Sequence, residues 1–303
     1  MKKSLLIFLG ISNILLATEF DYGNGTFSMQ GGFLGAVEKM DTDVTTYSIT
    51  TRHANLFGDY FYAYDINWYE SKTLNQMTHN YNNLASSLNG LFGGANSSLS
   101  IPAMKYTLQG IDANAKIGYD IIHQDDDNYF GVGALVGISL PWIESSKKTS
   151  SSSNNNNSSN NSLLGTFPDT KTSIQTYKLG ATVSFQKSLL DKKISLYGMG
   201  SYAYQTGKIK NDYLDSDYSV DGTFQEYNIG LYFTPFTEKY KLWFLTLSPR
   251  IYATLGYKYS KWSVDKMSIN MSGKEVNSDI LSPFDMEFNM DSSIGYFGIG
   301  YSF

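Results

Sequence analysis

Eight charged residues lie in stretches that alternate between large apolar residues and small or polar ones, and these side chains have the most chemistry to offer. They are Asp65, Asp112, Lys116, Asp120, Lys178, Glu226, Arg250 and Lys258. Carboxylates and amines that face one interior can pair across it and close it, or they can line separate walls and form a narrow hydrated pore with weak ion preference. The sequence leaves both interpretations open.

Residues suited to catalysis or metal binding are sparse. The three histidines, His53, His79 and His123, form no His-Ser or His-x-Ser pair, and the chain has no cysteine for a disulfide or a thiolate metal site. The acidic run Asp125–Asp127 falls in an expected turn, where adjacent carboxylates are more often solvated than bound to a cation. We therefore predict no enzymatic activity, no metal site and no cofactor.

The charged residues belong to segments with a two-residue period, which is the period of a β-strand. In Phe130–Trp142, for example, large apolar residues alternate with Gly131, Gly133, Gly137 and Ser139. The other predicted strands are Thr26–Glu38, Val44–Ala54, Tyr62–Tyr69, Ile111–Ile121, Tyr177–Gln186, Ile194–Lys208, Glu226–Thr234 and Leu245–Ser260, followed by a strand at the C-terminus. The facing of 194–208 is ambiguous, and the register of the first pair could slip by one residue.

Short and long connections alternate between these strands. The short ones are Gly58–Asp59, His123–Asn128, Asp191–Lys192 and Thr237–Lys241, and the long ones are Ser71–Lys105, Glu144–Ser173, Asn211–Ser219 and Lys266–Phe288. A short Met40–Asp43 connection on the side of the long ones is the exception. The count is about ten strands, with eight or twelve as alternatives.

The C-terminal residues Ser293–Phe303 carry the most specific pattern. Phe297, Ile299, Tyr301 and Phe303 alternate with Gly298, Gly300 and Ser302. This end resembles the C-terminal signal of Gram-negative outer-membrane β-barrels, in which the final aromatic residue and its alternating partners are read by the barrel assembly machinery. The resemblance implies an all-β, single antiparallel transmembrane barrel with short periplasmic turns and long external loops. The Asn-, Lys-, Tyr- and Phe-rich style is similar to outer-membrane proteins of Helicobacter and Campylobacter relatives.

The N-terminal residues predict export. A basic start, Met1–Lys3, precedes an apolar stretch that ends near Ala17, which is typical of a cleaved signal peptide over residues 1–17. The alternative, a membrane anchor, needs ~20 apolar residues. The mature barrel domain would then be 18–303, located in the outer membrane of a Gram-negative bacterium.

Composition agrees with a barrel and disfavours other classes. The chain has 24 Tyr and 18 Phe, few prolines, and a mild formal charge of -5, which argues against a nucleic-acid partner. After the N-terminus, no apolar run reaches the length of a membrane helix. A soluble β-sandwich would have shorter strands and a polar face rich in Lys and Glu, whereas this polar face is rich in Gly, Ser, Thr and Asn.

Two long loops have compositions of their own. The Ser/Asn tract Lys147–Ser162, inside the loop 144–173, cannot bury enough apolar surface to order itself, and it predicts a mobile external loop. It is either a receptor-facing surface or a tolerated insertion. The segment His79–Gly94 has helical apolar spacing, and it could constrict the barrel mouth or pack on the rim.

The functional expectation is a small porin-like channel for ions or small polar solutes, lined by the eight charged residues above. The alternative is a non-conducting structural or adhesin barrel that acts through its external loops. Expected partners are outer-membrane lipids, lipopolysaccharide, the assembly machinery and a possible host or surface ligand.

Overall fold

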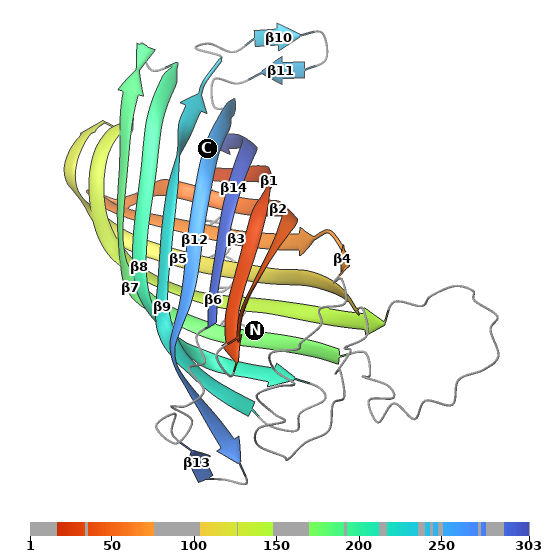
Figure 1. The fold of residues 1–303 in the computed structure, drawn as a ribbon. Coiled ribbons are helices and arrows are strands. Elements are labelled where there is room, and N and C mark those ends of the chain that lie inside the picture. The colour runs from red at the N-terminus through yellow and green to blue at the C-terminus, as the bar shows by residue number, and fades with distance from the viewer. Residues whose placement is uncertain are drawn as a thin grey trace, which may run out of the picture.

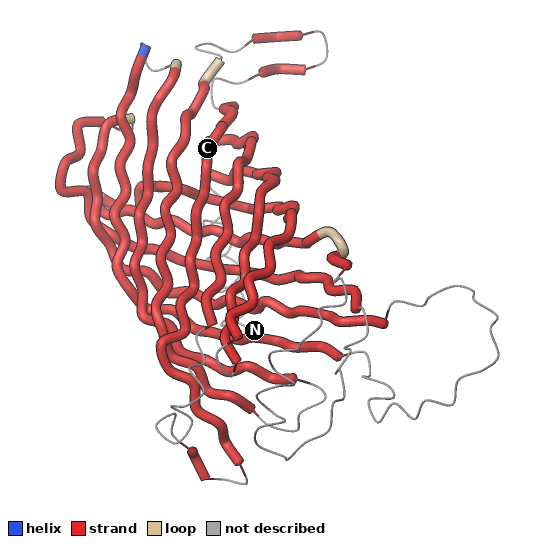
Figure 2. The backbone as a smooth tube through the Cα atoms, in the orientation of Figure 1, coloured by secondary structure: helices blue, strands red, loops and turns tan. Residues whose placement is uncertain are grey.

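The chain forms long β-strands through most of the part that its computed structural model describes. The described residues are 17–33, 36–75, 104–125, 127–147, 170–190, 193–211, 217–235, 240–242, 245–247, 251–271, 274–276 and 288–302. Figures 1 and 2 show the strands wrapping around one axis. Among the described residues, no helix is both long and apolar enough to cross a membrane.

Ten long strands build the wall. They are β1 (Ala17–Phe33), β2 (Ala36–Phe57), β3 (Tyr60–Ser71), β5 (Met104–Asp125), β6 (Asn128–Lys147), β7 (Thr170–Leu189), β8 (Ile194–Asn211), β9 (Asp217–Phe233), β12 (Ile251–Met271) and β14 (Phe288–Ser302). The shortest of them has 12 residues and the longest 22, which exceeds the ~9–11 residues that a tilted strand needs to cross a bilayer. Two short strands, β4 (Leu74–Asn75) and β13 (Lys274–Val276), pair with the ends of β5 and β12.

The sheet closes on itself. The wall strands pair antiparallel in chain order, β9 pairs with β12, and β14 pairs with both β12 and β1. Closure leaves no free edge among the wall strands, so their backbone groups are paired within the sheet, as a bilayer requires. The predicted all-β fold with a single antiparallel barrel of ten strands is confirmed.

The two faces of the wall differ in composition. Outward side chains form an exposed apolar surface that includes Phe20, Tyr47, Trp68, Ile117, Val136, Leu179, Tyr202, Ile229, Leu255 and Ile299. Inward positions carry buried polar, charged and aromatic residues, and glycines such as Gly131 on β6. The strand 194–208 had an ambiguous facing in the sequence, and Ser195, Tyr197, Ser201 and Ala203 place its odd positions inside.

The strand registers put the short connections at one end. Tyr60 follows the Gly58–Asp59 turn and pairs with Tyr119. Ile194, at the start of β8, pairs with Phe233, at the end of β9. Ala253 pairs with Phe233 and also with Ile299, which lies near the end of β14. Gly58 has φ of 58°, a left-handed conformation that glycine adopts without steric cost. The loops after β4, β6, β8 and β13 leave from the opposite end, which we call the long-loop end.

The predicted boundaries of the first strand pair were wrong. β1 begins at Ala17 instead of Thr26, and Met40–Asp43 lies inside β2 instead of forming a turn. Continuous pairing from Glu19↔Thr50 to Phe33↔Ala36 moves the link to residues 34–35. The acidic residues resembled a turn because they face water: Asp41 and Asp43 are exposed, whereas Thr42 between them is buried.

The predicted Thr237–Lys241 link and the strand starting at Leu245 were also wrong. β10 (Tyr240–Leu242) pairs with β11 (Leu245–Leu247) in a separate ribbon, and the wall strand β12 starts at Ile251. Pro249, which has no N–H to give to a ladder, stands between the two segments. β12 then continues to Met271, past the predicted end at Ser260, with a bulge after Val264.

Candidate functional site

Seven of the eight charged residues singled out from the sequence have inward, buried or nearly buried side chains. Asp65, Asp112, Lys116, Asp120, Lys178 and Glu226 are buried, and the side chain of Lys258 keeps 16% exposure. Arg250 lies outside the described residues. Apart from a register shift directly after Asp120, the strands are regular around these positions, so alternation along each strand decides which face its charge occupies.

Four of these residues form a closed ring of ion pairs, which we call the lumen ring. Lys116 Nζ lies 3.1 Å from Asp65 Oδ1 and 2.9 Å from Glu226 Oε1. Lys258 Nζ lies 3.3 Å from Asp65 Oδ2 and 2.9 Å from Glu226 Oε2. β6, β7 and β8 stand between the strands of Lys116 and Glu226, and β14, β1 and β2 stand between those of Lys258 and Asp65. The Lys116–Glu226 and Lys258–Asp65 contacts therefore cross the lumen.

A second group joins the lumen ring on the side of β5 and β7. Lys178 pairs with Asp112, and its Nζ lies 3.8 Å from the centre of the Phe224 ring. Asp112 also accepts hydrogen bonds from Asn114 Nδ2 at 2.7 Å and from the Ser139 hydroxyl. Asn114 Nδ2 in turn contacts Asp65 Oδ2 at 2.9 Å, so the two groups are one connected network.

A third group, the Arg52 cluster, surrounds Arg52, and its residues come from β1, β2, β8 and β14. Arg52 Nη2 lies 2.7 Å from Glu19 Oε1 and 3.1 Å from Asp21 Oδ2. The guanidinium carbon stands 4.7 Å from the centre of the Tyr197 ring and 4.9 Å from that of Tyr296. Since β2 and β8 are on opposite sides of the barrel, this cluster also spans the lumen.

The sequence interpretation missed Glu19, Asp21, Arg52 and His53. Glu19 and Asp21 alternate with the outward Phe20 and Tyr22, a signal that was available but was lost when β1 was taken to start at Thr26. Arg52 and His53 are adjacent, so a regular strand could not turn both inward. A register shift between Thr51 and Ala54 allows it, because a bulge re-aims side chains.

Two histidines meet a carboxylate at the end with the short connections. Asp120 Oδ2 lies 3.1 Å from His53 Nε2 and 3.3 Å from His123 Nδ1, and His53 stacks on Tyr129 with ring centres 3.7 Å apart. Within the described part of the chain, no group of three or more His, Asp or Glu could hold a metal ion. Asp120 is thus joined to histidines near this end and takes no part in the lumen ring.

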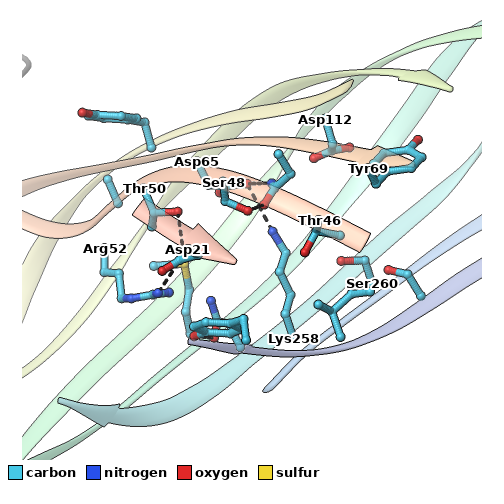
Figure 3. Close-up of a pocket in the computed structure, with 18 of the residues that line it drawn as sticks. Asp21, Thr46, Ser48, Thr50, Arg52, Asp65, Tyr69, Asp112, Lys258 and Ser260 are labelled. Carbon is cyan, nitrogen blue, oxygen red and sulfur yellow. Dashed lines mark hydrogen bonds and ion pairs between the residues drawn. The ribbon is translucent and has the colours of Figure 1, made fainter. Parts of the chain in front are cut away.

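Apolar side chains fill the lumen toward the long-loop end, and a pocket remains beside them. Phe27, Tyr69 and Trp262 pack together, with Phe27 centred 5.8 Å from Tyr69 and 6.0 Å from Trp262. The pocket holds about 800 Å³ of space that atoms do not fill, part of it open to solvent. Figure 3 shows Lys258 reaching toward Asp65 in this pocket, with Arg52 beside Asp21.

The predicted assembly signal lies on the outer face where the structure describes it. Phe297 and Ile299 are exposed, and Tyr301 is partly exposed. Phe303, residues 1–16 of the predicted signal peptide, and residues 79–94 and 148–162 of the two loops of unusual composition lie outside the described residues, whereas Ala17 begins β1 and Lys147 ends β6. Together with the closed wall, the apolar outer face is the architecture of integral outer-membrane β-barrels.

Comparison with known proteins gives similarity in fold alone. No protein-family model matches the sequence, and no curated protein matches it. The outer membrane protease OmpT of Escherichia coli is 9% identical, with 95% of this chain and 97% of that chain covered at a TM-score of 0.49. The NalP translocator domain of Neisseria meningitidis is 11% identical, with 100% and 95% covered at 0.37. Ail of Yersinia pestis is 10% identical, with 94% and 99% covered at 0.29. None of these values supports a transfer of activity.

Proposed function

We propose that this chain is an integral outer-membrane barrel whose lumen is closed by ion pairs, and that it acts as a non-conducting surface barrel through its external side. The observation that supports this proposal is the lumen ring, in which Lys116 and Lys258 each join carboxylates on opposite walls. An ion that passes this level must separate buried pairs, and stripping a buried charge of its partner costs several kcal/mol. The ring therefore favours the closed reading over an open porin.

The second candidate is a small porin-like channel for ions or small polar solutes. The pocket beside the ring, which is partly open to solvent, favours it, and so do the inward glycines of β6, which keep that wall thin. These are Gly131, Gly133 and Gly137. In this reading the lumen ring is a constriction that opens, and the mixed charges give weak ion preference.

Planar-bilayer recording separates the two. We expect wild-type protein to give no conductance steps, and Lys116→Ser/Lys258→Ser, which removes both bridging side chains, to give discrete steps. Lys208→Ser, an exposed position on β8, is the matched control and should stay silent. Regular steps from the wild type would overturn the closed reading and favour the channel.

The external side is tested separately. Deletion of 147–162 should abolish binding of cells to host matrix or to a host surface if the chain is an adhesin, without creating conductance. Binding that survives this deletion would place the adhesive surface elsewhere or remove the adhesin role.

The outer-membrane location, the signal peptide 1–17, contacts with lipopolysaccharide and recognition by the assembly machinery belong to the same proposal. Deletion of Phe303 should impair insertion while export across the inner membrane continues. Heat-modifiable migration on a gel reports insertion, because folded barrels resist unfolding by detergent until heated. Recovery of the wild-type chain in a soluble periplasmic fraction would overturn the location.

A further inference from the structure

Three oxygen atoms meet where the first and last wall strands close the barrel. Gly298 on β14 stands between Asp21 of β1 and Thr254 of β12, its partners in the two ladders. A methyl group at Gly298 would collide with Asp21 Oδ1, Glu19 Oε1 and Thr254 Oγ1. Two carboxylate oxygens and one hydroxyl oxygen therefore surround the small space that this glycine leaves. We call them the three-oxygen group.

The other buried charges of the described lumen are matched. The lumen ring and the group beside it have three carboxylates and three cations, all in ion pairs. These are Asp65, Asp112, Glu226, Lys116, Lys178 and Lys258. Asp120 has two histidines as neighbours, His53 and His123. Within the part of the chain that the structure describes, none of these lysines pairs with Glu19 or Asp21, so Arg52 alone serves both carboxylates.

The Arg52 cluster thus carries one surplus negative charge, and the contacts place it on Asp21. Arg52 donates twice to Glu19, from Nε to Oε2 at 3.1 Å and from Nη2 to Oε1 at 2.7 Å. Asp21 accepts through Oδ2 alone, from Arg52 Nη2 at 3.1 Å and from the Thr50 hydroxyl at 3.2 Å (Figure 3). Asp21 Oδ1 is buried and accepts no hydrogen bond from a described residue, and the side chain is only 7% exposed.

A small cation fits the space from which a methyl group is excluded. A carbon atom approaches an oxygen to ~3.3–3.6 Å, whereas calcium, a hard cation, contacts its oxygen ligands at ~2.3–2.6 Å. Carboxylate oxygens are the ligands that hard cations prefer. The Thr254 hydroxyl donates its hydrogen to Glu19 Oε1, which leaves an oxygen lone pair for an ion. The three-oxygen group therefore has the donor chemistry of a hard-cation site.

The charge of the cluster selects a monovalent ion. One such ion and Arg52 balance Glu19 and Asp21, whereas a divalent ion would leave a positive excess in a buried place, which is costly. A proton shared by the two carboxylates would also balance the charge, but it would use neither the third oxygen nor the space at Gly298. Sodium is close to calcium in size and potassium is larger, so the small space favours sodium.

Water and ions can reach this group through the pocket in the lumen. Asp21, Thr50 and Arg52 line that pocket, which is partly open to solvent. The cavity volume that water can occupy in it is about 60 Å³, more than the ~10–15 Å³ that one water molecule needs. Hard cations take more than three oxygen ligands, 6–8 in the case of calcium. Water in the pocket can supply the ligands that the protein does not.

From the unpartnered carboxylate oxygen, the surplus charge and the space at Gly298, we propose that the barrel binds one sodium ion at the seam of β1, β14 and β12. Asp21 Oδ1, Glu19 Oε1 and Thr254 Oγ1 are its protein ligands. The ion neutralises the Arg52 cluster and holds the first and last wall strands together. This site does not depend on whether the barrel conducts.

Urea titration of the folded full-length mature barrel in neutral-detergent micelles tests the proposal. Sodium chloride replaces choline chloride at constant ionic strength. We expect the folding equilibrium constant to rise at least about tenfold between zero and about 100 mM sodium, which corresponds to a dissociation constant of about 10 mM or tighter. Potassium in place of sodium should raise it by about threefold or less.

Three outcomes would overturn the sodium site. Equal stability in sodium and choline would show that no ion binds. An equally large effect of potassium would contradict selection by size. A folding equilibrium that changes between pH 6 and pH 8 but not with sodium would identify a shared proton as the occupant.

Asp21→Asn locates the site, because it keeps the shape of the side chain and removes the surplus charge. In this variant the sodium effect should fall below about twofold, and in choline it should be more stable than the wild type. Asp43→Asn, at an exposed carboxylate of β2, is the matched control and should keep the full effect. Thr254→Val, which removes the hydroxyl ligand, should weaken sodium binding roughly fivefold. An undiminished sodium effect in Asp21→Asn would contradict binding at this group.

A second readout does not depend on unfolding. Sodium that exchanges with a protein site broadens the sodium NMR signal, so the wild type and Asp43→Asn should broaden it, and potassium in excess should not remove the broadening. Folded Asp21→Asn should give the narrow signal of micelles alone. Broadening that is the same in all three proteins would show that the ion binds elsewhere.

Discussion

The lumen ring and the Arg52 cluster both bury charges across the same barrel, but their charge balance differs. The ring has two cations for two carboxylates, and each of its cations touches both carboxylates. The Arg52 cluster has one cation for Glu19 and Asp21, and the faces of two tyrosine rings lie against its guanidinium. The ring is therefore redundant, whereas the cluster depends on a single side chain.

The largest expected effect is from Arg52→Met, which leaves two buried carboxylates without a cation. We expect the free energy of unfolding to fall by about 3–5 kcal/mol, the cost of breaking a buried pair. Urea titration in micelles, followed by heat-modifiable migration, measures it. The triple variant Arg52→Met/Glu19→Gln/Asp21→Asn should recover most of the loss. If Arg52→Met lowers the free energy of unfolding no more than Lys116→Met does, the Arg52 cluster does not depend on a single cation.

Lys116→Met should cost less, about 2–3 kcal/mol, because Lys258 still contacts both ring carboxylates. The same urea titration measures the change. Adding Glu226→Gln removes the surplus carboxylate and should restore stability. A double variant that is less stable than Lys116→Met alone would contradict the redundancy of the ring.

Gly298→Ala tests how tightly the Arg52 cluster is packed against β14. A methyl group at Gly298 would collide with Asp21 Oδ1, Glu19 Oε1 and Thr254 Oγ1. We expect a loss of about 1–2 kcal/mol from overpacking. Gly295→Ala is the matched control, because its methyl group would meet only Asn24 O, at 3.9 Å. Equal stability of the two variants would show that the cluster has room to move.

Lys258→Met should have a smaller effect, about 1 kcal/mol, because this side chain keeps 16% exposure and Lys116 retains both carboxylates. Urea titration of this variant and of Lys116→Met shows which lysine contributes more to the free energy of unfolding. A larger loss for Lys258 than for Lys116 would reverse the assignment of the main bridge.

The smallest effect is expected from Lys72→Ala. Lys72 Nζ lies 3.1 Å from Asp43 Oδ2, the same distance as Lys116 from Asp65, but both side chains are mostly exposed. Solvent and salt screen such a pair, so the unfolding midpoint should not move measurably. A shift comparable with that of Lys116→Met would show that burial does not control these energies.

Alternation along the strands made the inward charges predictable one strand at a time. Asp65, Lys116 and Lys258 could be placed on an inner face because each sits between outward apolar residues, and Glu226 because it precedes the outward Tyr227, Ile229 and Leu231. Their partners could not be predicted, since Lys116 and Glu226 are 110 positions apart in the chain. Which residues meet depends on the stagger of the strands and on the barrel diameter, and local sequence encodes neither.

The misread elements have equally local causes. The N-terminal strand was cut short because Glu19 and Asp21 follow directly on the predicted signal peptide, and Arg52 and His53 were missed because a bulge breaks the two-residue period of β2.

By itself, the sequence determined the strand class, the outward apolar face and the inward position of most charges, because a two-residue period is a local property of the backbone. Only the tertiary structure decided that the lumen charges pair across the barrel, that Arg52 lies between two tyrosines, and that a pocket remains beside them. Closure of the sheet brings together side chains from strands that are neighbours neither in sequence nor in the hydrogen-bonded order.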